Sequence, residues 1–160
     1  MSHTIYQTEG IVLSKRDFGE AERIYNIYTE KFGMVTAVAQ GVRLLKSKLR
    51  YNLDLFAFGN FSLVAGKEIW RLTDAEEIKK IEDNNTPLFS RIAGFLLRMI
   101  RGEEKSDFIW QKVKNLFLRG ADEAETLAEI LHNLGYMAGI PNGKKEKIEA
   151  INKAIKESML

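Results

Sequence analysis

The segment from Tyr6 to Leu72 constrains the fold most, because short runs of alternating apolar and polar residues are separated by glycine-bearing turns. A period of two places side chains on opposite faces of a strand, and glycine permits bends and tight turns between strands. Strands are expected at 10–16, 23–29, 34–40, 52–65 and 68–73. Gly33 is expected in a left-handed conformation that closes a hairpin, and Gly59 at a bulge. Five strands with one long connection predict an OB-like β-barrel.

The pattern changes to helical spacing after Thr73. A short helical turn is expected at 74–78, and Thr86 and Pro87 have the chemistry of a helix start. Further helices are expected from 106 to about 120, from 122 to 136 and from Lys144 onward. We predict an α+β protein in two parts: a five-stranded OB-fold nucleic-acid-binding domain over 1–80 and an α-helical domain over 81–160.

The predicted helices carry apolar stripes that indicate which faces are buried. The first stripe is Leu88, Ile92, Phe95, Leu96 and Met99. The second is Ile109, Trp110, Val113, Leu116 and Phe117, the third Ala124, Leu127, Leu131 and Leu134, and the last Ile148, Ile151, Ile155 and Met159. Such spacing is typical of helices that bury one face in a bundle.

The composition argues against catalysis. The 160 residues include no cysteine and two histidines, which excludes thiolate chemistry and Cys-based zinc or iron–sulfur sites. His132 follows Glu129 by one helical turn and has no second metal-ligand candidate beside it, so a structural histidine is expected. No glycine-rich phosphate loop is present. We therefore expect a non-enzyme without metal or cofactor. The N-terminus lacks the features of a secretory signal and no apolar run approaches roughly 20 residues, so a cytoplasmic protein without membrane contact is expected.

The net charge of +2 is small, but its distribution is uneven. Residues 1–72 hold ten Lys/Arg and seven Asp/Glu, a net charge of +3, and residues 43–50 alone carry +4. Cations between the strands of a barrel can neutralise phosphates. The predicted DNA-binding residues are Lys15, Arg16, Arg23, Arg43, Lys46, Lys48 and Arg50. Tyr51 is the candidate for stacking on a base, with packing in the barrel core as the alternative.

A second cationic set lies in the predicted helices. The residues Arg91, Arg98, Lys112 and Arg119 could rim an apolar groove near Phe95, Trp110 and Phe117 that captures an acidic peptide. Solvated helix faces are the alternative.

Several motifs in order resemble one known family. They are Thr8-Glu-Gly-Ile-Val-Leu13, Asp17-Phe-Gly-Glu20 with Arg23, Thr29-Glu-Lys-Phe-Gly33, Gly41 with Ser47-Lys-Leu-Arg50, and Leu131-His-Asn-Leu-Gly-Tyr136. This pattern resembles RecO, the bacterial recombination mediator of DNA repair. The resemblance implies an N-terminal OB-fold, a helical C-terminal domain, and annealing of complementary strands by binding single- and double-stranded DNA. It also implies RecR and the acidic C-terminal tail of single-stranded-DNA-binding protein as partners, and a nucleoid-associated location.

The chain also departs from that family's pattern. Typical members continue well past this length, and some carry a Cys-based zinc site after the Gly-Tyr motif, where this sequence has Ala138-Gly-Ile-Pro-Asn142 and no cysteine. We therefore expect a short member of the family without zinc. A protein-interaction adaptor that touches DNA weakly, and an RNA-binding OB-fold module, remain alternative functions.

Overall fold

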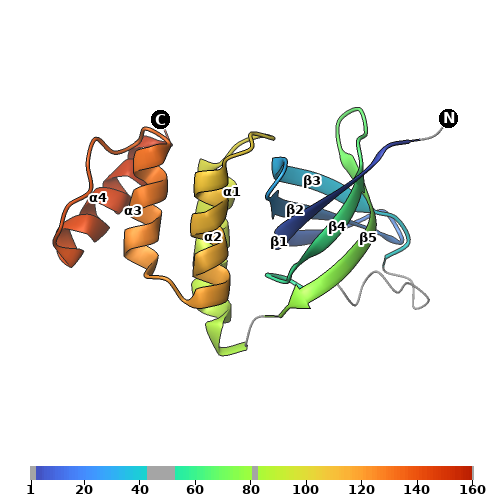
Figure 1. Ribbon diagram of the computed structural model, residues 1–160, viewed down its shortest axis with the longest axis horizontal. Coiled ribbons are helices and arrows are strands. Elements are labelled where there is room, and N and C mark those ends of the chain that lie inside the picture. The colour runs from blue at the N-terminus through green and yellow to red at the C-terminus, as the bar shows by residue number, and fades with distance from the viewer. Residues whose placement is uncertain (1–2, 43–52, 81–82, 160) are drawn as a thin grey trace. The chain divides into compact units, whose positions relative to one another are not determined.

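The computed structural model describes residues 3–42, 53–80 and 83–159 and contains five strands followed by four α-helices (Figure 1). The strands are β1 (Ile5–Phe18), β2 (Glu22–Thr29), β3 (Gly33–Ala39), β4 (Phe58–Val64) and β5 (Trp70–Lys79). A 3-10 turn, η2 (Asp83–Asn85), precedes α1 (Thr86–Met99), α2 (Asp107–Arg119), α3 (Glu123–Asn133) and α4 (Lys144–Glu157). Two compact units result, residues 1–106 and 107–160.

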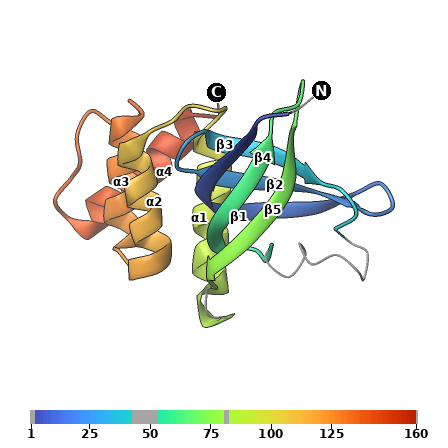
Figure 2. The same cartoon turned by 45° about the vertical axis from the view of Figure 1, so that its right-hand side comes forward.

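The five strands close on themselves through the long strand β1. Residues 5–11 of β1 pair with β4, whereas residues 10–18 pair with β2. A short parallel pairing of β3 with β5 completes the order β1-β2-β3-β5-β4 of a closed barrel. Figure 2 shows β4 between β1 and β5, as the pairings require. The prediction of a five-stranded sheet followed by helices is confirmed, and this closed order fits the OB fold.

Strand β5 extends through Lys79, so the helical turn predicted at 74–78 is wrong. Asp74 and Glu76 pair with β4 and are exposed, whereas Ala75 between them is buried at 3% exposure. Pairing with a neighbouring strand overrides the helical propensity of this acidic run, because the ladder satisfies its backbone.

The barrel interior is filled by small and branched apolar side chains, Leu63 among them, around the two aromatic rings of Tyr25 and Phe61. The other members of this core are Val12, Ile27, Val35, Ala37, Ala39, Val42, Leu53, Leu72 and Ala75. A register shift lies next to Gly59, where a bulge is predicted, but the extra residue is Ile78 of β5, because Phe58 pairs with Lys79 and Gly59 with Glu77. A Cβ at Gly59 would lie 2.6 Å from the carbonyl oxygen of Glu76, so only glycine lets β4 and β5 approach here.

The hairpin between β2 and β3 closes as predicted, with Gly33 at φ +67°. The Thr29 hydroxyl donates to the Gly33 carbonyl at 2.8 Å and accepts from the Phe32 amide at 3.0 Å. The Thr8 hydroxyl of β1 accepts from the Lys31 amide at 3.2 Å and so ties the turn to the next strand. The two buried threonine hydroxyls thus form hydrogen bonds with backbone groups of the turn that strand pairing alone would leave without partners.

Helix α1 belongs to the first compact unit. Its buried residues Phe89, Ile92, Ala93, Phe95, Leu96 and Met99 include all of the predicted stripe except half-buried Leu88. Phe89 meets Phe56 with ring centroids 6.1 Å apart, and α1 contacts β1. The helix begins at Thr86 with Asn85 as N-cap, one residue before the predicted cap. A division at residue 80 therefore separates strands from helices, whereas the compact units divide after Ser106.

The second compact unit consists of α2, α3 and α4. All five predicted residues of α2 are buried, and Asp122 caps α3 by accepting from the Glu125 amide at 2.9 Å. The stripe predicted for α4 is wrong in part: Ile151 is buried, but Ile148 is 41% and Met159 66% exposed. Ala154 takes the inner position instead. None of the helices within the described ranges is long and apolar enough to cross a membrane.

Candidate nucleic-acid interface

One row of residues crosses the outer face of the barrel. Arg16 of β1 pairs with Ile24 of β2, Ile24 pairs with Val38 of β3, and Val38 lies beside Arg71 of β5. Residues in register share a face, and the neighbours Tyr25 of β2, Ala37 and Ala39 of β3 and Leu72 of β5 belong to the barrel core. We call Arg16, Ile24, Val38 and Arg71 the arginine row. Its two ends are exposed arginines, separated by three strand spacings or roughly 14 Å.

A polar row lies next to the arginine row on the same face. The Asn26 amide nitrogen donates to the Ser14 hydroxyl at 2.8 Å, and the Thr36 hydroxyl donates to the Asn26 amide oxygen at 2.8 Å. These bonds fix the orientation of the amide. Phe18, at the end of β1, is 54% exposed beside Gly19 at φ +63°. The face therefore combines cations, oriented hydrogen-bonding groups and an exposed aromatic ring, the three components of many nucleic-acid surfaces.

The predicted cations of the first strands do not all share this face. Lys15 pairs with Tyr25 and Asp17 with Arg23, so Lys15 and Arg23 alternate with Arg16 and lie on its opposite side. Arg23 Nε donates to Asp17 at 2.8 Å, and this hydrogen bond raises the pKa of the guanidinium. Part of the Arg23 charge is thereby neutralised, whereas Lys15 and Arg16 remain exposed.

The predicted basic loop falls outside the described residues. The residues concerned are Arg43, Lys46, Lys48, Arg50 and Tyr51. Val42 before them and Leu53 after them are both buried in the barrel core, at 0% and 1% exposure. The barrel core thus includes a residue on either side of this segment, and the assignment of these five residues to DNA stays a prediction.

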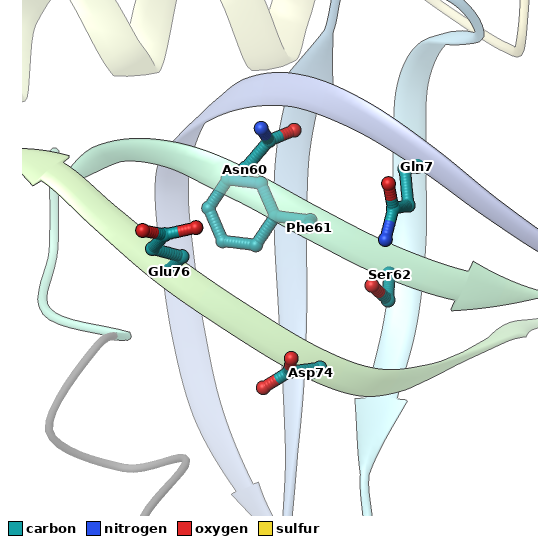
Figure 3. A pocket seen from close by; sticks show the side chains of 6 residues that line it. All are labelled: Gln7, Asn60, Phe61, Ser62, Asp74 and Glu76. Atoms are coloured by element: carbon teal, nitrogen blue, oxygen red, sulfur yellow. The ribbon is translucent and has the colours of Figure 1, made fainter.

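The outer face of β1, β4 and β5 has the opposite charge character. A shallow pocket there is lined by Gln7, Asn60, Phe61, Ser62, Asp74 and Glu76 (Figure 3). Asp74 and Glu76 contribute two carboxylates, and no cation lines this pocket. Carboxylates repel phosphates, so a polyanion is disfavoured on this face relative to the arginine row. Within the described ranges, no three His, Cys, Asp or Glu side chains are grouped as metal ligands.

The four cations predicted to hold a peptide lie in two compact units. Arg91 and Arg98 are on α1, whereas Lys112 and Arg119 are on α2. Lys112 forms an ion pair with Glu129 and lies 5.3 Å from the centroid of the Phe108 ring. The apolar residues predicted beside them are core: Phe95 is 7%, Trp110 1% and Phe117 5% exposed.

Comparison with known proteins decides the family. Residues 1–81, half of the chain, match the family model described as recombination protein O N terminal. The chain belongs to the RecO family. The DNA repair protein RecO of Synechocystis sp. is 32% identical over 139 residues, covering 86% of this chain and 51% of that protein. That of Clostridium acetobutylicum is 28% identical over 145 residues, covering 82% of the chain and 59% of the relative.

The chain spans about half the length of these RecO relatives. Each of these relatives is named a DNA repair protein. Two residues of the candidate interface, Phe18 and Arg71, were not singled out from the sequence. Arg71 alternates with Trp70 and Leu72 in a predicted strand, which signals an outward position. Its place beside Val38 depends on the parallel pairing of β3 with β5, for which the sequence has no local signal.

Proposed function

We propose that this RecO-family protein is a non-enzymatic DNA-binding protein that anneals complementary strands as a recombination mediator. The observation that carries the proposal is the contrast between two outer faces of one barrel. The arginine row runs from β1 across β2 and β3 to Arg71 of β5 and is flanked by oriented polar groups on β1, β2 and β3. Asp74 and Glu76 make the face of β1, β4 and β5 anionic. A polyanion binds the first face and is repelled by the second.

The mechanism needs no cofactor or bond-breaking step. Two DNA strands repel each other through their phosphates, and this repulsion opposes pairing. Arg16 and Arg71, together with the cations of 43–50, neutralise phosphates and release counterions. Base pairing then drives formation of the duplex.

The test compares two double variants of equal net charge. Arg16→Gln with Arg71→Gln removes two positive charges from the arginine row, whereas Asn60→Asp with Ser62→Asp adds two negative charges to the opposite face. We expect the arginine variant to bind single-stranded DNA more weakly and to flatten the plot of log affinity against log salt by up to about 1.4 units, and to anneal more slowly. The aspartate variant should behave like the parent. Equal effects in both variants would show that net charge, not the arginine row, governs binding.

A partner role is part of the same proposal, with RecR and the acidic tail of single-stranded-DNA-binding protein as partners. Arg98 supports the second of these, because its Nε is buried with no hydrogen-bond partner among the described residues and Arg91 is exposed on the same helix. A fluorescent tail peptide should bind the full chain with micromolar affinity, about −8 kcal/mol, and Arg98→Glu should abolish binding. Peptide binding unchanged by Arg98→Glu would contradict this site.

Binding measurements on the same protein also distinguish two alternative functions. An adaptor with weak DNA contact would give a nearly flat salt dependence, because few phosphates would be neutralised. An RNA-binding module would prefer RNA to DNA of equal length in direct competition, because the 2′-hydroxyl distinguishes the two.

A further inference from the structure

Three aromatic rings meet where β1, β3 and β5 begin. The Tyr6 ring centroid lies 5.5 Å from that of Phe32 and 5.9 Å from that of Trp70, both at interplanar angles of 80°. The Phe32 and Trp70 centroids are 5.1 Å apart. Tyr6 comes from β1, Phe32 from the turn before β3, and Trp70 from the start of β5. We call these three residues the aromatic cap.

The members of the aromatic cap differ in burial. Phe32 and Trp70 pack against the barrel core, and Trp70 Nε1 donates to the Glu103 carboxylate. Tyr6 remains 41% exposed. Edge-to-face contacts from two anchored rings hold Tyr6 in one orientation at a low cost in side-chain entropy. Phe32 and Trp70 are half-buried, so Tyr6 is the exposed ring of the three.

Cations flank the aromatic cap along the chain. Lys31 precedes Phe32, Lys67 lies in the loop before Trp70, and Arg71 follows Trp70; all three are exposed. None of the residues that the structure describes forms an ion pair with them. Glu68 lies in the same loop, and Glu103 is engaged by Trp70. Arg71 is also one end of the arginine row and follows Trp70 in β5. Because adjacent side chains of a strand alternate, the aromatic cap and the arginine row lie on different sides of β5 and adjoin at this one step of the chain.

We propose that the aromatic cap is a stacking site for a base of single-stranded nucleic acid, with Tyr6 as the ring that the base meets. This inference rests on the proposed function. Lys31, Lys67 and Arg71 hold the phosphates of the nucleotides on either side, and the arginine row holds the strand beyond Arg71. Stacking on a ring is tolerant of sequence because every base has an aromatic face, as an annealing protein requires.

The test separates bases from phosphates. The probes are an oligothymidylate and an abasic oligonucleotide of the same length, which carries the same phosphates without bases. We expect Tyr6→Leu to bind the oligothymidylate about tenfold more weakly and the abasic strand as the parent does, with an unchanged salt dependence for each. Tyr6→Phe keeps the ring and should bind both strands as the parent does. Melting temperatures establish that each variant is folded.

Trp70 supplies a second readout that does not depend on changing the cap. The chain has two tryptophans, and Trp110 is 1% exposed in the other compact unit. In a Trp110→Phe protein, Trp70 should be quenched by the oligothymidylate and not by the abasic strand. Salt-dependent binding of both strands with no effect of Tyr6→Leu and no quenching would overturn the stacking site while leaving the proposed function intact. Absence of salt-dependent binding to either strand would overturn the proposed function itself.

Discussion

At the scale of the residue, Gly33 has two independent reasons to be glycine. Its φ of +67° lies in the left-handed region, which a Cβ disfavours. A Cβ would also lie 2.5 Å from the carbonyl oxygen of Glu104, because residues 102–104 pack over the start of β3, where the Met34 amide donates to the Gly102 carbonyl at 3.3 Å. The turn geometry could be predicted from the Lys-Phe-Gly pattern. The close approach could not, because it joins residues far apart in the sequence.

Gly33→Ala should therefore lower the free energy of unfolding by more than the roughly 1 kcal/mol of backbone strain alone. The matched control is Gly94→Ala in the middle of α1, where a Cβ meets no atom within 4 Å. That change should be neutral or stabilise by up to about 1 kcal/mol. Chemical denaturation measures both. If the two variants were equally stable, residues 102–104 would be able to move away from a Cβ at position 33 without lowering the free energy of unfolding.

Glu77 of β5 is a residue whose charge opposes folding. Burial raises the pKa of its carboxyl, with Lys80 Nζ 3.9 Å away acting in the opposite direction, and one carboxylate oxygen has no hydrogen-bond partner among the described residues. A carboxyl whose pKa is raised on folding favours the folded state when protonated, so this contribution is lost as pH rises from the unfolded to the folded pKa. Glu77→Gln should remove that loss, so its stability should fall less than the parent's as pH rises above the ordinary pKa of a glutamate carboxyl. Thermal melts with Glu76→Gln as the control test this, and equal pH profiles for the two variants would contradict the role of burial.

At the scale of the element, local patterns predict what local forces determine. The buried face of α2 follows from its apolar spacing, and all of its predicted residues are buried. In α4 the spacing alone misleads: the helix packs against α3 and buries Ile151 and Ala154, whereas Ile148 is exposed. β5 likewise extends past its predicted end, because β4 offers a partner along its length. Partners that lie far away in the sequence thus determine where these elements end and which face they bury. A local sequence pattern does not identify those partners.

The basic loop remains a prediction at this scale. Replacing Arg43, Lys46, Lys48 and Arg50 by Ala should weaken binding to all DNA sequences similarly and flatten the salt dependence by up to roughly one unit for each lost phosphate contact. The control replaces four exposed lysines of α4, Lys144, Lys145, Lys153 and Lys156, by Ala, with the same change in net charge. Filter binding over a salt series measures both. An equal loss in the two variants would assign the effect to net charge.

At the scale of the whole molecule, the sheet and α1 form one compact unit through Ser106. A sequence division at residue 80 follows the change from strand to helix pattern. It does not account for the apolar surface that α1 and the following segment cover. Removing residues after 80 takes away Phe89, Ile92 and Leu96 and the backbone contact of Gly102 with Met34. The surface beneath them would be exposed to water, at a cost of about 25 cal/mol for each Å².

A protein of residues 1–106 should therefore melt cooperatively, remain monomeric in gel filtration and bind single-stranded DNA with the salt dependence of the full chain, since the arginine row and the aromatic cap both lie within it. A protein of residues 1–80 should melt at a lower temperature or aggregate, because the Phe56 ring loses its contact with Phe89 and the Met34 amide loses its hydrogen bond to the Gly102 carbonyl. A separate peptide of residues 81–106, added to the shorter protein, is the control and should raise its melting temperature. If residues 1–80 alone fold as stably and bind DNA as strongly as residues 1–106, then α1 is dispensable to the barrel, and the functional division lies at the boundary that the sequence predicts.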